Sequence, residues 1–153
     1  MKRRQFFYSV VAGASISLVG VARAAGESMT VYKDPNCGCC HAWAEAMKKA
    51  GFSVRAEDVD DLNIIKERFA VPAEMQGCHT AIVAGYYVEG HVPVEAVKRL
   101  MAERPQIAGL AVPGMPAGSL GMGDDPKASY DVYSVPRLGG DATIYMSVRP
   151  DQR

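Results

Sequence analysis

Three of the four cysteines in this chain of 153 residues lie in one short stretch, 36–41, which reads Asn-Cys-Gly-Cys-Cys-His. The fourth cysteine occurs in a second Cys-His pair, Cys78-His79, and the remaining histidine is His91. Every cysteine and histidine therefore falls between positions 37 and 91. Thiolates and imidazoles bind soft and borderline metal ions, and thiolates also carry out disulfide exchange. Both chemistries require that these side chains meet in space.

The first 24 residues have the pattern of an export signal. A basic start, Met1-Lys2-Arg3-Arg4, precedes an apolar run rich in Gly, Ala and Ser, and Ala22-Arg23-Ala24 is a small-x-small cleavage site. The paired arginines also fit a twin-arginine signal, with an ordinary secretory signal as the alternative. Four of the 17 basic residues and none of the 17 acidic ones lie in this segment, so the remainder carries a net charge of −4. We expect one domain over residues 25–153, a periplasmic location, no nucleic-acid partner and no membrane association after cleavage.

Export constrains what the cysteines do. In an oxidising compartment free thiols form disulfides, bind metal or react. Two disulfides are one interpretation of four cysteines. However, Cys37, Cys39 and Cys40 are too close in sequence to act as ordinary loop staples, and a bridge between neighbours is strained. The spacing therefore favours a functional site over a structural framework.

Hydrophobic periodicity predicts the elements that position these residues. The pattern predicts strands over 29–32 and 52–57, and a hairpin of strands 80–84 and 86–89. It predicts helices over about 39–50, from Asp60 or Asp61 to before Pro72, and from Pro93 to before Pro105. The predicted order is β-α-β-α-β-β-α, an α/β fold. Its first two strands should be parallel with a right-handed crossover.

This order, with the Cys-x-x-Cys spacing of Cys37 and Cys40 after the first strand, resembles a thioredoxin-like domain. In that fold the third strand lies beside the first and runs in the opposite direction. The loop after the first strand and the segment entering the third then share one end of the sheet. The resemblance therefore implies that the Cys37–Cys40 stretch meets Cys78 and His79.

The C-terminal part has two features. Residues 109–126 are rich in Gly and Pro but also apolar, so we expect an irregular segment that lies against the domain over the cysteines. Residues 130–133 and 142–145 then predict a final β-hairpin, joined through Pro136 and Gly139-Gly140.

Two functions compete for the cysteine site. A dithiol-disulfide oxidoreductase would use Cys37 and Cys40, whose position at a helix N-terminus favours the thiolate. A metal site would use the same thiolates. The extra thiol of Cys39 favours metal, and so does the sequence before the third strand. Gln76-Gly77-Cys78-His79 stands where thioredoxin-like oxidoreductases place a cis-proline.

The donor set favours copper over zinc. A mononuclear zinc site needs four ligands, and four cysteines with up to three histidines exceed that number, so bridged sites with several ions are an alternative. An exported, sulfur-rich site leans toward copper. The candidate ligands are Cys37, Cys39, Cys40, Cys78, His79 and His91. Met115 and Met122 are optional thioether donors, with packing of their segment against the domain as the preferred interpretation.

Four motifs together resemble the CopG-type family of periplasmic copper-resistance proteins, long described only as a domain of unknown function. They are Asp-Pro-Asn-Cys-Gly-Cys-Cys at 34–40, Gly-Cys-His-Thr at 77–80, Tyr-Val-Glu-Gly-His-Val-Pro at 87–93 and Gly-Leu-Ala-Val-Pro-Gly-Met-Pro at 109–116. The resemblance covers residues 29–148. It implies a cysteine-bridged copper cluster on Cys37, Cys39, Cys40 and Cys78, with His79 or His91 as further ligands, and redox interchange of Cu(I) and Cu(II).

We therefore expect an exported, thioredoxin-like copper-binding protein that contributes to copper resistance, with a copper-handling protein as candidate partner. Whether it is an enzyme, as a copper oxidoreductase, stays open. The alternatives are an exported thiol-disulfide oxidoreductase using Cys37 and Cys40, and a structural zinc-binding module.

Overall fold

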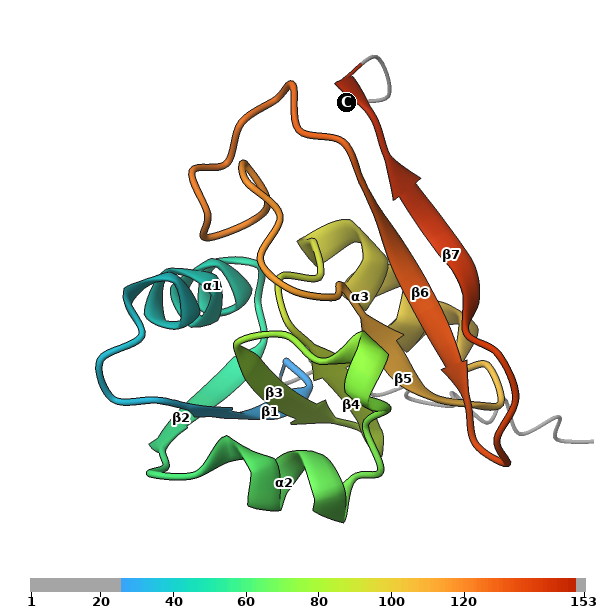
Figure 1. Ribbon diagram of the computed structural model, residues 1–153. Coiled ribbons are helices and arrows are strands. Elements are labelled where there is room, and N and C mark those ends of the chain that lie inside the picture. The colour runs from blue at the N-terminus through green and yellow to red at the C-terminus, as the bar shows by residue number, and fades with distance from the viewer. Residues whose placement is uncertain (1–25, 151–153) are drawn as a thin grey trace, which may run out of the picture.

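The computed structural model describes residues 26–150 (Figure 1). The predicted export signal, residues 1–24, lies outside this range. Seven strands form one sheet in the order β2-β1-β3-β4-β5-β6-β7. The strands are β1 (Ser28–Lys33), β2 (Ser53–Asp58), β3 (His79–Val83), β4 (Tyr86–Glu89), β5 (Ile107–Ala111), β6 (Tyr130–Pro136) and β7 (Thr143–Val148). The helices are α1 (Gly38–Lys49), α2 (Leu62–Arg68) and α3 (Val94–Glu103), with a 3-10 turn, η1, over Ala73–Met75.

The first four strands have the predicted arrangement. β1 pairs in parallel with β2 and antiparallel with β3, and β3 and β4 form the predicted hairpin. The hairpin turns at Ala84 and Gly85, which both have positive φ, as a two-residue turn between twisted strands requires. The predicted α/β class and the C-terminal hairpin of β6 and β7 are confirmed.

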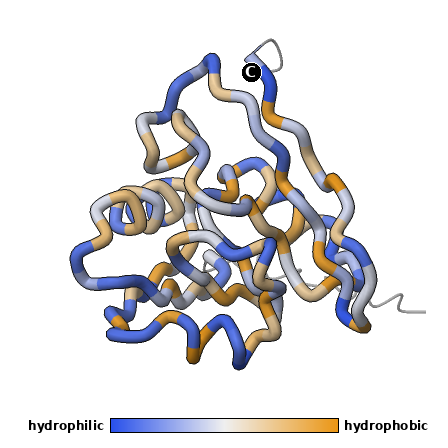
Figure 2. The backbone as a smooth tube through the Cα atoms, in the orientation of Figure 1, coloured by the Kyte–Doolittle hydropathy of each residue, from blue (hydrophilic) through white to orange (hydrophobic). Residues whose placement is uncertain are grey.

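The sheet has a different core on each face. α1 and α3 cover one face, where Trp43, Met47, Val97 and Leu100 pack on the central strands. α2 covers the opposite face, where a smaller cluster includes Val71 and Tyr87 (Figure 1). In Figure 2 hydrophobic and hydrophilic residues follow each other closely along α2, as expected of a helix with one face on the sheet.

Local sequence explains where the helices begin and end. The carboxylate of Asp61, one of the two predicted caps, caps α2 by accepting from the amide of Asn63. α1 ends in a Schellman arrangement, in which the Phe52 amide donates to the Met47 carbonyl and Gly51 has a φ of +103°. Pro93 is the N-cap of α3, so the helix begins at Val94, one position after the predicted first helical residue.

One prediction about the Gly/Pro-rich segment is wrong. Its first residues are not irregular, because Gly109 to Ala111 belong to β5, which pairs with both β4 and β6. Gly109 permits this pairing, since an added Cβ would lie 2.2 Å from the Tyr87 carbonyl oxygen. The rest of the segment, 112–126, contains turns, and its Gly121 packs on the N-terminal part of α1.

Among residues 26–150, no helix has both the length and the hydropathy that crossing a bilayer demands.

Candidate metal centre

The first half of the site is the N-terminus of α1. Asp34 turns the chain after β1, since its side chain accepts from the Asn36 amide at 2.7 Å and its carbonyl from the Cys37 amide at 3.1 Å. Cys37 is the N-cap, and its sulfur accepts from the Cys40 amide at 3.3 Å. Cys39 and Cys40 follow in the first turn. A helix N-terminus stabilises negative charge, so this position favours thiolates once the cysteines are reduced.

The second half of the site enters β3. Because β1 and β3 are antiparallel, the end of β1 lies beside the start of β3, and Lys33 pairs with His79. Cys78 stands immediately before β3, so it faces the cysteines that follow β1. The sheet topology thus brings the two Cys-His stretches together, as predicted.

The four cysteine sulfurs form one group, whose ligand atoms all lie within 4.8 Å of one another. Cys37 and Cys40 form a disulfide, and Cys39 and Cys78 are free. The sulfur of Cys78 lies 3.5 Å from that of Cys40 and 3.9 Å from that of Cys39. Ligation by all four sulfurs therefore requires reduction of the Cys37–Cys40 disulfide.

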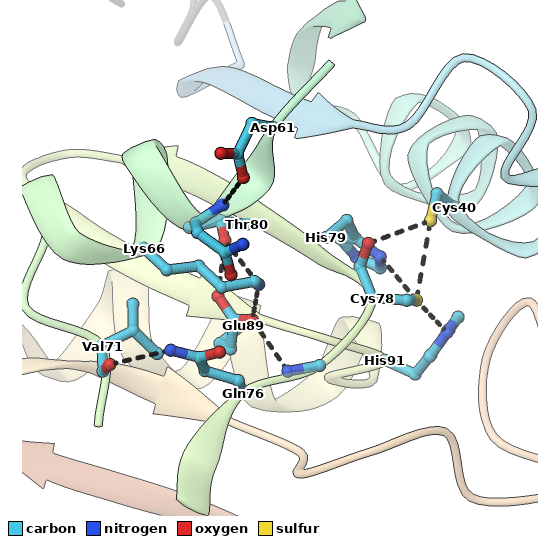
Figure 3. Close-up of polar contacts among 12 residues, drawn as sticks. Cys40, Asp61, Lys66, Val71, Gln76, Cys78, His79, Thr80, Glu89 and His91 are labelled. Carbon is cyan, nitrogen blue, oxygen red and sulfur yellow. Dashed lines mark hydrogen bonds and ion pairs between the residues drawn. The ribbon is translucent and has the colours of Figure 1, made fainter. Parts of the chain in front are cut away.

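His91 lies directly against the cysteine group (Figure 3). Its Nε2 is 2.9 Å from the sulfur of Cys78, and its Nδ1 donates to the Leu120 carbonyl at 2.8 Å. The carbonyl can only accept, so the proton sits on Nδ1 and the Nε2 lone pair faces the sulfurs. A histidine whose second nitrogen donates to a backbone carbonyl has the arrangement typical of metal ligands.

His79 occupies the buried side of the site. Its Nδ1 lies 3.4 Å from the Cys78 sulfur, and its ring centroid lies 4.5 Å from that of Trp43. Its Nε2 is buried without a hydrogen-bond partner. The ring therefore has a polar atom that the described protein atoms do not satisfy, which fits a ligand. Packing against Trp43 is the structural role that this residue has in any case.

Burial keeps both imidazoles neutral. Desolvation is the main cause that lowers the pKa of His79 to about 3, with smaller contributions from His91 and Lys66. Desolvation also lowers the pKa of His91, although the Leu120 carbonyl opposes it. Neutral imidazole is the form that binds metal ions, so the site holds both rings in the binding form at physiological pH.

The thiol of Cys78, in contrast to the imidazoles, is held in the protonated form, which does not bind metal ions. Burial is the largest cause that raises its pKa to about 12, followed by the charge of the neighbouring Cys39 thiol. In the protein without metal this thiol is therefore protonated. A metal ion has to displace the proton, so binding at Cys78 should release a proton and become tighter as pH rises.

The segment after β5 packs against the candidate site, with contacts to His91 and to α1. Leu120 supplies the acceptor for His91, and Gly121 packs so tightly on α1 that an added Cβ would lie 2.7 Å from the Cys39 carbonyl oxygen. This agrees with the prediction that the segment lies over the cysteines. Met115 is 57% exposed, and Met122 is half-buried. His41 is exposed and belongs to neither group of candidate ligands.

Sequence reasoning missed a buried ion pair behind the site. Lys66 is the only fully buried residue of α2, and it contacts the buried carboxylate of Glu89. The spacing of apolar residues around Lys66 in the sequence does indicate that this side chain is buried. Leu62, Ile65, Lys66 and Phe69 have the i, i+3, i+4, i+7 spacing of one helix face, so Lys66 lies on the stripe that faces the sheet.

The fold and site together define an α/β protein with a sulfur-rich centre of the kind that holds soft metal ions. A family model described as "Protein of unknown function, DUF411" matches residues 75–122. Two solved structures, "Copper resistance protein copG- Form 1" and "Form 2", are similar to the chain with TM-scores of 0.74 and 0.73. Their identities to it are 37% and 39%, over 80% of this chain and 97% and 98% of theirs. No curated protein matches the sequence.

The chain therefore belongs to the CopG-type copper-resistance family. This agrees with the resemblance noted in the sequence. Membership and the cysteine group together support a copper-related role.

Proposed function

We propose that this protein binds copper in a cysteine-thiolate cluster and thereby contributes to copper resistance. Cys37, Cys39, Cys40 and Cys78 supply the thiolates, and His79 and His91 complete the coordination. The observation that carries the proposal is the convergence of these side chains from three separate segments into two overlapping groups that share Cys78. The names of the two related structures add support for copper as the metal.

The thiolate and imidazole ligands fit copper. Thiolates are soft ligands that suit Cu(I), and neutral imidazole suits both oxidation states of copper. Six donors around one point exceed the four of a mononuclear zinc site, so we propose more than one copper ion per chain, with thiolates as bridges. The mixture of thiolate and imidazole also fits an interchange of Cu(I) and Cu(II), in which a copper-handling protein receives or supplies the electron.

Binding depends on the state of the Cys37–Cys40 pair. Two electrons and two protons convert the disulfide into two thiols, which then lose their protons to become ligands. A reduced protein thus offers four sulfurs, whereas the oxidised protein offers Cys39 and Cys78 alone.

The same disulfide supports one alternative. A Cys-x-x-Cys pair at a helix N-terminus is the arrangement of thiol-disulfide oxidoreductases. Cys37 is half-buried and Cys40 is buried, so access for a protein substrate is the weakest part of that alternative.

We further propose that residues 1–24 are an export signal, twin-arginine or ordinary, and that residues 25–153 act in the periplasm. The basic start, the apolar run and the cleavage site support this assignment. Fractionation of expressing cells, followed by N-terminal sequencing of the protein, tests it. A start at or near Ala25 in the periplasmic fraction is expected, and an intact Met1 in the cytoplasm contradicts it.

The test of copper binding is metal content per chain. The protein is purified under reducing, oxygen-free conditions, offered copper and zinc together, desalted and measured by elemental mass spectrometry. We expect more than one copper per chain, with a sharp loss in Cys78→Ser. One zinc per chain would support a structural zinc module. No metal, with catalytic reduction of insulin disulfides, would support the oxidoreductase.

A further inference from the structure

A closed ring of three buried polar side chains lies on the α2 face of the sheet and contacts the segment that carries Cys78 (Figure 3). Thr80 and Glu89 are cross-strand partners in β3 and β4, and the Thr80 hydroxyl donates to Glu89 Oε2 at 2.6 Å. Lys66 donates from α2 to Glu89 Oε1 and to the Thr80 hydroxyl, the latter at 3.1 Å. The exposed fraction of the side chain is 6% for Lys66 and 0% for Glu89. Each member thus bonds to the other two.

The ring has one further contact, and it leads to the metal centre. Glu89 Oε1 also accepts from the backbone amide of Gly77 at 2.8 Å. Gly77 immediately precedes Cys78, and Glu89 stands two residues before His91. The carboxylate therefore ties together the two chain segments that carry Cys78 and His91. Cys78 itself precedes β3, so the strand ladder does not hold it.

Close backbone packing completes the tie. An added Cβ on Gly77 would lie 2.6 Å from the Gly90 Cα, and one on Gly90 would lie 2.5 Å from the Val112 carbonyl oxygen. The Gly90 amide donates to the His79 carbonyl at 2.9 Å. The backbone on either side of Cys78 is thus packed closely against the segment that leads to His91, and Glu89 bonds to the Gly77 amide within that contact.

A stability role alone accounts poorly for the ring. Burying two opposite charges costs desolvation that their attraction only partly offsets, and apolar replacements of such pairs are often neutral or stabilising. What a buried carboxylate with three donors does provide is a fixed geometry. None of the three ring residues belongs to the groups of candidate metal ligands among the described residues.

We propose that Lys66, Thr80 and Glu89 are positioning residues for the metal centre. Glu89 holds the Gly77 amide so that the Cys78 thiol already faces His91 Nε2 before metal binds, and Lys66 and Thr80 hold the carboxylate in place. The proposal rests on the proposed copper function for its consequence in binding. Its structural part concerns the protein without metal and is tested there.

Two double variants separate the hydrogen bond from the charge. Lys66→Met with Glu89→Gln removes both charges but keeps a side-chain oxygen that accepts from the Gly77 amide. Lys66→Met with Glu89→Leu removes the charges and the acceptor. Both avoid an unpaired buried charge, which would itself unfold the protein. The two double variants differ only in the side chain at position 89, which in the Leu variant loses its bonds to Gly77 and to Thr80. Of these two bonds, Thr80→Val removes only the second.

The first readout needs no metal. In reduced, metal-free protein, the alkylation rate of Cys78 by iodoacetamide is followed by peptide mass spectrometry, with Cys39 as internal reference. We expect several-fold faster alkylation of Cys78 in the Leu variant and a rate close to wild type in the Gln variant. Equal rates in wild type and both folded variants would overturn the proposal.

The second readout is Cu(I) affinity, measured by competition with a chromophoric chelator. Loss of a group that orients metal ligands costs roughly ten- to a hundredfold in affinity, so we expect a loss of that size in the Leu variant and retention in the Gln variant. An equal loss in both variants would overturn the role of the Gly77 bond. If wild type bound no copper, the proposed function would fail, and the alkylation rates would still decide the positioning role.

Thr80 provides a second route should the Leu variant not fold. Thr80→Val removes the donor to Glu89 Oε2 at almost constant volume, and Thr80→Ser retains it. We expect faster Cys78 alkylation and weaker Cu(I) binding in Thr80→Val, with Thr80→Ser restoring both. Identical behaviour of the two Thr80 variants and wild type would contradict the proposal.

Discussion

Nε2 of His91 lies 2.9 Å from the sulfur of Cys78, although Cys78 precedes the β3–β4 hairpin in the sequence and His91 follows it. The hairpin is antiparallel, so the residue before its first strand and the residues after its second meet at one edge. Because the Nδ1–H of His91 donates a hydrogen bond to the Leu120 carbonyl, the nitrogen that faces Cys78 is the one with a free lone pair. A thiol and an unprotonated imidazole nitrogen, both of which can bind a metal ion, thus lie next to each other.

The contact between His91 and Cys78 predicts that His91→Gln weakens Cu(I) binding. The variant removes a proposed nitrogen ligand, and we expect its Cu(I) affinity to fall roughly tenfold or more. Chelator competition on reduced protein measures the change. His41→Gln is the matched control, because His41 is exposed in the first turn of α1 and outside both groups of candidate ligands. Equal affinities in the two variants would remove His91 from the site.

The Cys37–Cys40 disulfide predicts that copper capacity follows the redox state of the protein. A disulfide sulfur carries no thiolate charge, so the oxidised protein should bind about half the copper of the reduced protein or less. Diamide-treated and reduced samples are compared by elemental mass spectrometry, with free thiols counted in each. A double variant, Cys37→Ser with Cys40→Ser, should match the oxidised sample in both states. Full copper loading with the disulfide intact would contradict the thiolate assignment for this pair.

The close contact between Gly121 and α1 predicts that the segment after β5 does not tolerate a larger residue at this position. Alanine there would meet the Cys39 carbonyl oxygen at 2.7 Å, and Gly121 also has a φ of +84°. Gly123 is the matched control, because its φ is +105° but an added Cβ has no neighbour within 4 Å. Both variants carry the cost of a positive φ, and Gly121→Ala adds overpacking of about 1–3 kcal/mol.

Urea unfolding of the reduced protein measures that difference. We also expect Cys39 to become more reactive toward iodoacetamide in Gly121→Ala alone, since the segment has to move away from it. Equal unfolding free energies for the Gly121 and Gly123 variants would show that the segment shifts without cost and does not cover the site tightly.

The sequence predicted the parts of this fold that short-range patterns determine. Alternation and turn residues predicted the β3–β4 hairpin, and Asp61 marked the start of α2. β5 was missed because Gly109 and its alanine neighbours are poor strand formers. What makes these residues a strand is pairing with β4 and β6 on either side, which depends on residues more than 20 positions away.

The site shows the same division. The resemblance to a thioredoxin-like domain implied an antiparallel first and third strand, and with the cysteine positions it predicted that Cys78 meets the α1 cysteines. The ion pair of Lys66 with Glu89 was not predicted, since a lysine between apolar residues of a helix is ordinarily exposed. Helix periodicity places Lys66 on the face of α2 toward the sheet, but it does not identify the partner, a carboxylate 23 positions later.

The buried neutral state of His79 predicts how stability depends on pH. In the folded protein burial lowers its pKa to about 3, whereas its ordinary value is 6.5. Between these values the unfolded chain binds a proton that the folded protein does not, so the free energy of unfolding rises with pH across this window and is lost as pH falls. Over the whole window the loss amounts to a few kcal/mol.

The measurement is urea unfolding of metal-free, reduced protein at pH values from 7 to 4, for wild type and His79→Gln. Glu89 acts in the opposite sense, because burial raises its pKa, so at pH values just above its ordinary value of 4.5 the folded state binds more protons at Glu89 than the unfolded chain does. Comparing the two proteins cancels this contribution, since both retain Glu89. We expect the variant to be less stable at pH 7, because a cavity replaces the contact with Trp43, but to lose less stability on acidification. Parallel pH curves for the two proteins would mean that His79 takes up its proton in the folded state as readily as in the unfolded chain.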